Sequence, residues 1–265
     1  MERLLRPVGV FDSGIGGISV LAEALRLLPF ENYVYYGDHL HVPYGDKQPG
    51  EVLALTRTAV EKLVGMGCKA IILACNTATS AAASTLRQEL DMPIIGMEPA
   101  LKPASELAGD GDVLVMATQM TLSQPKFRRL MQRYGKNAVE VPCPGLMEYV
   151  ESEQLSGEAI TAELQALLFS HIGKPMKAAV LGCTHYVFLR QAIRATLGEK
   201  IPLLDGNRGT VLQLERRLRE QNLLCSEDKH GGNVDFYTSA VDEGETLKKM
   251  ERMLRVALEQ NEIPS

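Results

Sequence analysis

The 265-residue sequence predicts an α/β protein of two similar halves, each built on a mainly parallel sheet. One observation behind this prediction is that short β-branched and apolar runs alternate with helical patterns, as in βαβ units. The other is an internal repeat, in which the segment 69–77 (KAIILACNT) recurs as 177–185 (KAAVLGCTH), 108 positions later. The repeat indicates that one architecture occurs twice along the chain.

The predicted elements follow one another in a regular order. Strands are expected at 7–11, 33–36, 70–74, 93–96, 113–116, 138–141, 178–181, 202–204 and 234–237. Helices are expected at 19–28, 50–66, 79–90, 124–134, 158–169, 187–196, 210–221 and 244–260. This pattern favours parallel sheets covered by helices.

Two further matches extend the repeat and suggest domain limits. Residues 92–95 align with 201–204, and more weakly 10–13 align with 116–119, so three matches occur in the same order at similar offsets. We expect one domain to comprise 1–97 plus 208–265, with 98–207 as the second. The last segment has no repeat partner and is expected to return to the first half. The chain should cross from one domain to the other near residues 96–99 and 205–209.

Composition excludes several classes of protein. A net charge of -5 gives no basic footprint for nucleic acid, and no apolar run approaches the ~18 residues of a membrane span. The N-terminal residues lack the apolar stretch of a secretory signal. Five cysteines without a Cys-x-x-Cys pair favour neither a disulfide framework nor a zinc ribbon. We therefore expect a cytoplasmic protein with free thiols, no bound metal, and no nucleic-acid or membrane partner.

Polar motifs follow the predicted strands at their carboxyl ends, where parallel α/β sheets bind ligands. They are the glycine loop 12–17 (DSGIGG), 75–77 (CNT), 183–185 (CTH), and Thr118 with Thr121. The glycine loop is an incomplete dinucleotide fingerprint, and the carboxylate of Asp12 would repel a pyrophosphate. We expect its glycines to allow a tight turn and a close approach of the helix start to a small ligand.

Cys75 and Cys183 are the candidate reactive groups because each ends a strand and precedes a helix among polar neighbours. A helix N-terminus lowers the pKa of a thiol from about 8.5, which favours thiolate near neutral pH. His185 can exchange a proton with Cys183, and Asp12 can do so with Cys75. The pair Cys183-x-His185 lacks the second Cys/His pair of a zinc site. The other cysteines are expected to be buried hydrophobes: Cys68, Cys143 and Cys225.

Two facing thiols suit a racemase or epimerase, which needs a base on one face of a carbon acid and an acid on the other. A hydrolase would need a single cysteine and an oxyanion hole. A pyridoxal-phosphate racemase would need a lysine at the site, and Lys69 and Lys177 lie six residues before the cysteines, about 20 Å away along a strand. A cofactor-free site is therefore favoured.

These motifs resemble those of glutamate racemase, in the aspartate/glutamate racemase superfamily, over essentially the whole chain. The resemblance rests on 10–17 (VFDSGIGG), 36–38 with 43–45 (YGD, PYG), 74–79 (ACNTAT), 96–99 (GMEP), 181–186 (LGCTHY) and 234–239 (VDFYTS). It implies two pseudo-symmetric flavodoxin-like half-domains with the active site in the cleft between them. It also implies cofactor-independent interconversion of L- and D-glutamate, supplying the D-isomer for bacterial peptidoglycan, and we expect a homodimer.

The resemblance also implies roles for individual residues. Cys75 would deprotonate D-glutamate with help from Asp12, and Cys183 would deprotonate L-glutamate with help from His185 and the nearby Glu151. The α-carboxylate would be held by Asn76, Thr77 and Thr184. The remaining substrate-binding residues would be Ser13, Pro43, Tyr44, Gly45, Thr118 and Thr121.

The chain departs from the family pattern at three places. It has His39-Leu40-His41 where the family usually reads Thr-Ala-Arg, Val187-Phe188 in place of Pro-Leu, and Ala117 where a glycine is common. None of these removes an acid, a base or a carboxylate anchor, and His39 and His41 are expected to be loop residues on the solvent side. Because they could alter the loop over the site, aspartate or another carbon acid stays open as the substrate. A non-catalytic anion-binding module of the same fold is the alternative from another class.

Overall fold

Two parallel sheets organise the computed structural model, which describes residues 2–173, 176–225 and 232–262. The first sheet has the strand order β4-β3-β1-β2-β9. Its strands are β1 (Val8–Asp12), β2 (Tyr33–Gly37), β3 (Ala70–Leu73), β4 (Ile94–Gly96) and β9 (Val234–Thr238). β1 and β3 are fully buried, which explains why they read as continuous apolar runs in the sequence.

The second sheet has the order β6-β5-β7-β8. Its strands are β5 (Asp112–Ala117), β6 (Ala138–Pro142), β7 (Met176–Leu181) and β8 (Leu203–Asp205). Matching β1 to β5, β2 to β6, β3 to β7 and β4 to β8 turns the order β4-β3-β1-β2 into β8-β7-β5-β6. The internal repeat is therefore a repeat of topology as well as of sequence, and the predicted α/β class is confirmed.

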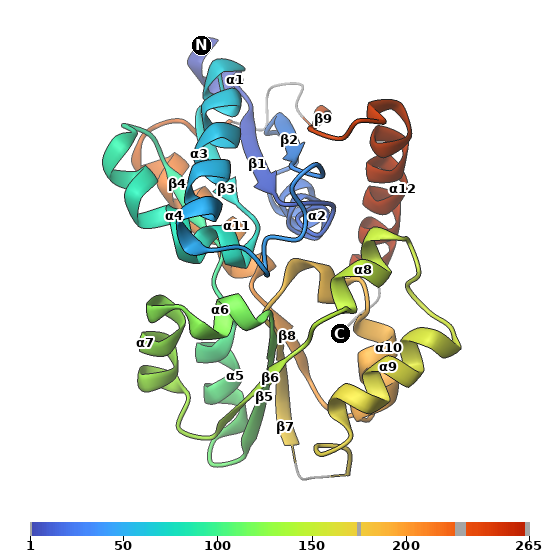
Figure 1. The fold of residues 1–265 in the computed structure, drawn as a ribbon. Coiled ribbons are helices and arrows are strands. Elements are labelled where there is room, and N and C mark those ends of the chain that lie inside the picture. Colours follow the sequence, from blue (N-terminus) through green and yellow to red (C-terminus); the bar gives the residue numbers. More distant parts are fainter. Residues whose placement is uncertain (1, 174–175, 226–231, 263–265) are drawn as a thin grey trace.

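Helices cover both sheets (Figure 1). Those expected from periodicity are α2 (Ile18–Leu27), α3 (Pro49–Gly65), α4 (Asn76–Glu89), α7 (Pro125–Tyr134), α9 (Glu158–Leu168), α10 (Arg190–Leu197), α11 (Asn207–Glu220) and α12 (Glu243–Glu262). The expected helix at 187–196 is shorter, because residues 184–187 form the 3-10 helix η1 (Thr184–Val187).

Four short helices were not expected from the sequence: α1 (Glu2–Leu5), α5 (Leu101–Ala108), α6 (Gln119–Ser123) and α8 (Leu146–Glu151). Each has eight residues or fewer, about two turns, which is too short for a 3.6-residue pattern to stand out. Two of them carry site residues, since Thr121 lies in α6 and Glu151 is the last residue of α8.

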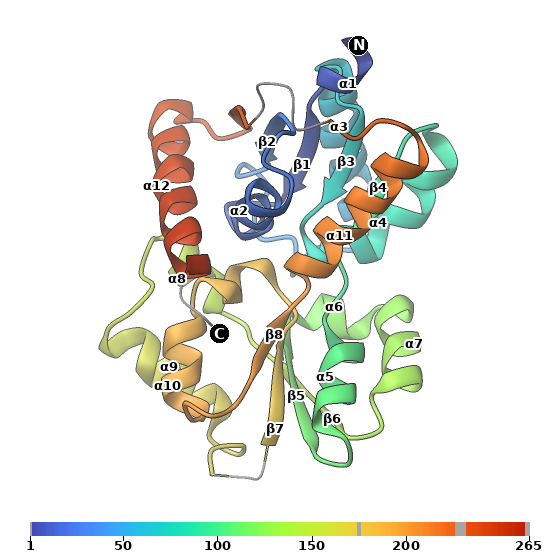
Figure 2. The same ribbon diagram turned by 180° about the vertical axis from the view of Figure 1, so that it is seen from behind.

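The C-terminal segment returns to the first sheet. β9 pairs in parallel with β2, and α11 and α12 both pack on α2. From there α12 runs down to the level of α8, beside the junction of the two sheets (Figures 1 and 2). The two crossing segments lie against each other, because a Cβ on Gly206 would collide with the carbonyl oxygen of Glu98.

Candidate active site

A small pocket lies between the carboxyl ends of the two sheets. Its lining comes from both halves of the chain: Ser13, Tyr44, Gly45, Cys75, Asn76, Thr77, Thr118, Thr121, Met147, Gly182, Cys183, Thr184 and His185. Its volume is about 10 Å³, close to what one water molecule requires. Eleven of the predicted site residues line it, Asp12 and Glu151 contact its walls, and Pro43 is not among the lining residues.

Cys75 is the N-cap of α4, and its Sγ accepts hydrogen bonds from the Ala78 amide at 3.4 Å and from the Ser13 hydroxyl at 3.6 Å. Burial, reinforced by the nearby charge of Asp12, raises the pKa of this thiol to about 12 against the bonds from Ala78 and Ser13. The expectation that the helix N-terminus would make Cys75 a ready thiolate is therefore wrong. Loss of hydration outweighs the helix terminus, and Cys75 holds its proton.

Asp12 ends β1 and is fully buried beneath the pocket. One carboxylate oxygen accepts from the Gly14 amide at 2.9 Å, and the other from the Thr184 hydroxyl at 3.2 Å. Burial raises the pKa of Asp12, although the positive charge of His185 opposes the shift. Because Thr184 belongs to the second half of the chain, that half helps to fix the carboxylate of Asp12 in the first half.

Cys183, His185 and Glu151 form a chain of contacts on the opposite side of the pocket. The Cys183 Sγ lies 3.7 Å from Nδ1 of His185, and the Nε2 of the same ring lies 2.8 Å from Oε1 of Glu151. The Ile15 amide donates to the same Oε1 at 2.9 Å. This order of thiol, imidazole and carboxylate is the arrangement in which a carboxylate orients a histidine toward a nucleophile or base.

The electrostatics of this side favour a protonated imidazole. Burial alone would lower the pKa of His185, but hydrogen bonds and charges from Cys183 and Glu151 raise it well above its ordinary value. Burial would likewise raise the pKa of Glu151, yet the hydrogen bond and charge of His185 and the Ile15 amide hold it at about 2. The surroundings therefore favour a positively charged His185 between Cys183 and Glu151.

The glycine loop makes room for the second half of the chain. A Cβ on Gly14 would overlap Oε1 of Glu151 and lie 3.0 Å from its Cδ. A Cβ on Gly16 would overlap Nδ1 of His185 and lie 2.6 Å from the Thr184 hydroxyl. The sequence predicts that these glycines allow a tight turn and a close approach to another group. In the structure the groups that approach them are the carboxylate of Glu151 and the imidazole of His185, from the other half of the chain.

Neutral donors form the rest of the wall. The hydroxyl oxygens of Thr77, Thr118 and Thr121 lie 3.0 to 3.3 Å apart and share hydrogen bonds across the two halves. Among the described residues, the side-chain amide of Asn76 has no hydrogen-bond partner, although it is only 4% exposed. A buried amide without a partner is expensive, so Asn76 is suited to binding a polar ligand in the pocket.

The loop after β2 differs in part from expectation. The Tyr44 hydroxyl donates to Asp38 at 2.7 Å, so it is committed to the protein, and burial raises the pKa of Tyr44. The side chain of His41 is 40% exposed and pairs with Asp38, as expected of a solvent-side residue. His39 is turned inward instead, with Nδ1 2.9 Å from the Thr238 hydroxyl of the returning segment.

Sequence reasoning missed several residues at the site. Met147 and Gly182 line the pocket, and Lys249 on α12 contacts Glu151. Gly182 precedes Cys183 and could have been included by adjacency. Met147 and Lys249 lie in helices whose neighbours in space cannot be inferred from one sequence.

No lysine is among the lining residues, and Lys69 lies at the far end of β3 from Cys75. Within the described ranges, no group of three or more His, Cys, Asp or Glu side chains is placed to hold a metal ion. The part of the chain that the structure describes also contains no helix with the length and apolar character needed to cross a membrane.

Comparison with known proteins identifies relatives of this architecture. A glutamate racemase of Clostridium perfringens is 50% identical over 239 residues, covering 89% of this chain and 92% of the relative. The crystal structure of Francisella tularensis glutamate racemase in complex with D-glutamate has a TM-score of 0.81 at 26% identity, covering 95% of this chain and 94% of that one. The Escherichia coli glutamate racemase, solved with L-glutamate and an activator, has a TM-score of 0.82 at 25% identity, covering 95% of each chain.

The sequence model of Asp/Glu/Hydantoin racemases matches residues 13–214, a stretch that contains both cysteine motifs and Glu151. The match therefore covers the second sheet, three strands of the first sheet, and all residues that line the pocket. On this match and the identity to the curated relatives, the chain belongs to the Asp/Glu/Hydantoin racemase family.

Proposed function

We propose that the protein is a cofactor-independent glutamate racemase that moves the α-proton between Cys75 and Cys183. The observation that carries the proposal is that both thiols line one pocket, each from the equivalent loop of a repeated sheet. Each thiol also has its own supporting group, Ser13 for Cys75 and His185 for Cys183. A substrate between them would have one sulfur on each face of its α-carbon, as a two-base reaction requires.

The reaction begins from an asymmetric protonation state. In the proposed starting state Cys183 is the base, a thiolate paired with a protonated His185, and the buried Cys75 is the thiol. The Cys183 thiolate takes the α-proton of L-glutamate, and the Cys75 thiol delivers its proton to the opposite face of the resulting carbanion. D-glutamate leaves, with Cys183 protonated and Cys75 as thiolate, and the reverse reaction begins from that state.

Neutral donors hold the two carboxylates of the substrate in this proposal. The α-carboxylate binds at Asn76, Thr77 and Thr184, beside the N-terminus of α4, where free amides favour anions. The side-chain carboxylate binds near Ser13 and the main chain of Tyr44 and Gly45, since the Tyr44 hydroxyl is occupied by Asp38. Donors fixed in a buried site stabilise the developing carbanion more than freely reorienting water would.

A proton-exchange experiment tests the proposal. The pure protein, without added cofactor, is incubated with L- or D-glutamate in deuterated water, and deuterium at the α-carbon and optical rotation are followed by NMR and polarimetry. We expect exchange and inversion from both isomers. Absence of exchange from either isomer contradicts the proposal, and faster exchange of aspartate than of glutamate reassigns the substrate.

Three further predictions accompany the activity. The product D-glutamate supplies peptidoglycan synthesis, so the gene should restore growth of a bacterium that requires added D-glutamate.

The chain forms a homodimer, which light scattering would detect as twice the mass of one chain. The domain limits are 1–97 with 208–265, and 98–207, and limited proteolysis should cut first near the crossings at 96–99 and 205–209.

A further inference from the structure

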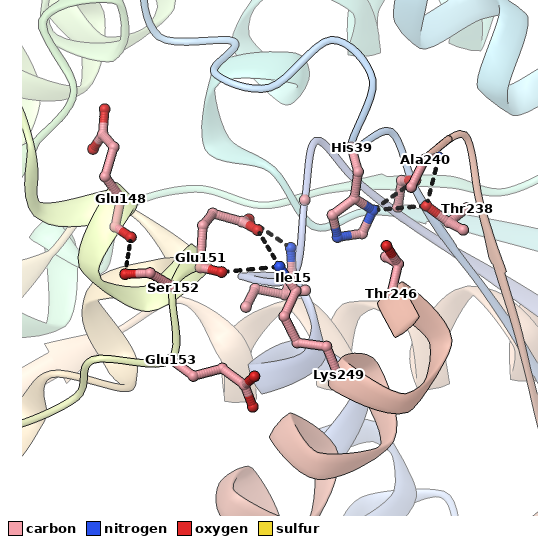
Figure 3. Close-up of polar contacts among 12 residues, drawn as sticks. Ile15, His39, Glu148, Glu151, Ser152, Glu153, Thr238, Ala240, Thr246 and Lys249 are labelled. Atoms are coloured by element: carbon pink, nitrogen blue, oxygen red, sulfur yellow. Dashed lines mark hydrogen bonds and ion pairs between the residues drawn. The ribbon is translucent and has the colours of Figure 1, made fainter. Parts of the chain in front are cut away.

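Lys249 on α12 reaches the acid of the Cys183 side from the C-terminal part of the chain (Figure 3). Its Nζ donates to the main-chain oxygen of Glu151 at 2.9 Å and lies 3.4 Å from Oε2 of the same residue. Glu151 is the last residue of α8, so its carbonyl lacks a partner within the helix. One ammonium group therefore binds both the backbone and the side chain of Glu151.

The carboxylate of Glu151 is held from three directions. Oε1 accepts from the Ile15 amide and faces Nε2 of His185, whereas Oε2 faces Lys249. The side chains of Glu151 and Lys249 are 15% and 21% exposed, so water competes only weakly for this contact. With Lys249 in place the carboxylate has one orientation, and in that orientation Oε1 lies 2.8 Å from the imidazole.

We propose that Lys249 is a positioning residue for the racemisation: it fixes Glu151, which in turn holds His185 against Cys183. This inference rests on the proposed function. Lys249 does not line the pocket and touches neither thiol, so its effect passes through Glu151. Loss of its ammonium group frees the end of α8 and one carboxylate oxygen, and the imidazole loses its fixed orientation.

A second ion pair makes it possible to distinguish the positioning of Glu151 from a general role in holding α12 against the rest of the protein. Arg252, one turn further along α12, donates to both carboxylate oxygens of Glu153 at 2.9 and 2.7 Å. This pair also joins α12 to the chain just after α8, but it is about 40% and 32% exposed and does not contact Glu151. Arg252 therefore provides a matched control that loosens the same junction without touching the acid.

The test compares Lys249→Met with Arg252→Met in the full chain. For Lys249→Met we expect kcat for glutamate to fall about 10- to 100-fold in both directions, because a displacement of about 1 Å in a catalytic group has that scale of effect. KM should stay within about twofold, since no substrate-binding residue is altered. Lys249→Arg should recover most of kcat, and Arg252→Met should retain the wild-type rate.

A double variant checks the route through Glu151. Once Glu151→Gln has weakened the contact with His185, adding Lys249→Met should cost much less than it does alone. Wild-type kcat in Lys249→Met, an equal loss in Arg252→Met, or no recovery in Lys249→Arg would each overturn the inference. So would unfolding of Lys249→Met at the assay temperature, seen by circular dichroism, because the role would then be structural. An inactive wild-type protein contradicts the proposed function itself.

Discussion

At the scale of single residues, the two thiols of the pocket sit in opposite surroundings. Burial, with the nearby charge of Asp12 as a second cause, raises the pKa of Cys75 to about 12. Cys183 faces an imidazole whose own pKa is raised by Cys183 and Glu151 despite burial. The repeat explains why there are two cysteines, and their unlike neighbours explain why the two are expected to play different parts in the reaction.

Replacing either thiol should stop racemisation. Serine is a far weaker base than a thiolate, so Cys75→Ser and Cys183→Ser should each lower kcat by about 10²- to 10⁴-fold, the usual contribution of a general acid or base. Polarimetry with each glutamate isomer measures the effect. Cys225→Ser, whose sulfur does not line the pocket, is the control. Full activity in either serine variant at the pocket would refute the two-base scheme.

The raised pKa of His185 predicts how stability depends on pH. A folded-state pKa above the ordinary 6.5 contributes stability that is complete below pH 6.5 and is lost as the pH rises through the folded value. The free energy of unfolding of wild type relative to His185→Gln should therefore decline above pH 6.5, as measured by urea titration. In a Cys183→Ser background the decline should end at a lower pH and be smaller in total, because one partner that raises the folded-state pKa of His185 is gone. A difference independent of pH would contradict the assignment.

At the scale of elements, the glycine loop between β1 and α2 is shaped by residues that are distant in the sequence. Glu151 and His185 occupy the space where side chains at Gly14 and Gly16 would lie. The sequence alone favours a tight turn and a nearby ligand at this loop. The structure adds that the loop also receives the acid and imidazole that serve Cys183.

Adding a methyl group to this loop should disable the Cys183 side. Gly16→Ala would push His185 and Thr184 outward, and a shift of about 1 Å predicts a fall in kcat of about 100-fold. Gly209→Ala, in α11 with no atom within 4 Å of the added carbon, is the control. It should keep full activity and gain about 0.4–1 kcal/mol in unfolding free energy. Equal kinetics in the two variants would contradict the close-approach argument.

The sequence predicted the elements with strong periodicity and missed those without it. The nine strands of the described residues all lie within two residues of their expected ends. Buried strands such as β1 and β3 are continuous apolar runs, and the partly buried β6 and β9 are marked by β-branched and aromatic residues. The short helices α5, α6 and α8 gave no comparable signal. Glu151, at the end of α8, was therefore identified only through the family resemblance, and the part played by Lys249 had no sequence signal.

At the scale of the whole molecule, the repeat predicts matching strand order but not matching function for each repeated residue. Lys69 and Lys177 occupy the same place in the two copies, six residues before each cysteine. Lys177 is exposed, whereas the Lys69 side chain is 1% exposed and lies 2.5 Å from Oε2 of the buried Glu31. The lysine of the first copy therefore forms a buried ion pair, whereas the lysine of the second copy is exposed.

Lys69 joins segments that are far apart in the chain. Besides Glu31, its Nζ donates to the main-chain oxygens of Leu4 at 2.6 Å and Leu223 at 2.9 Å. Glu31 in turn accepts from the Cys225 amide at 2.8 Å. The ammonium group thus holds the start of the chain and the segment after α11 against the first sheet, at the opposite end of β3 from the active site.

Removing this lysine should destabilise the fold without acting on the pocket. Lys69→Met leaves the carboxylate of Glu31 buried and unpaired, which predicts a loss of about 3–5 kcal/mol in the free energy of unfolding. Lys177→Met, the same change in the other copy, should alter it by less than about 0.5 kcal/mol. Urea denaturation measures both. In the double variant Glu31→Gln with Lys69→Met the loss should shrink, because no charge is left buried while Oε1 can still accept from Cys225. Equal stability of Lys69→Met and Lys177→Met would show that the two repeated lysines are equivalent, contrary to the structure.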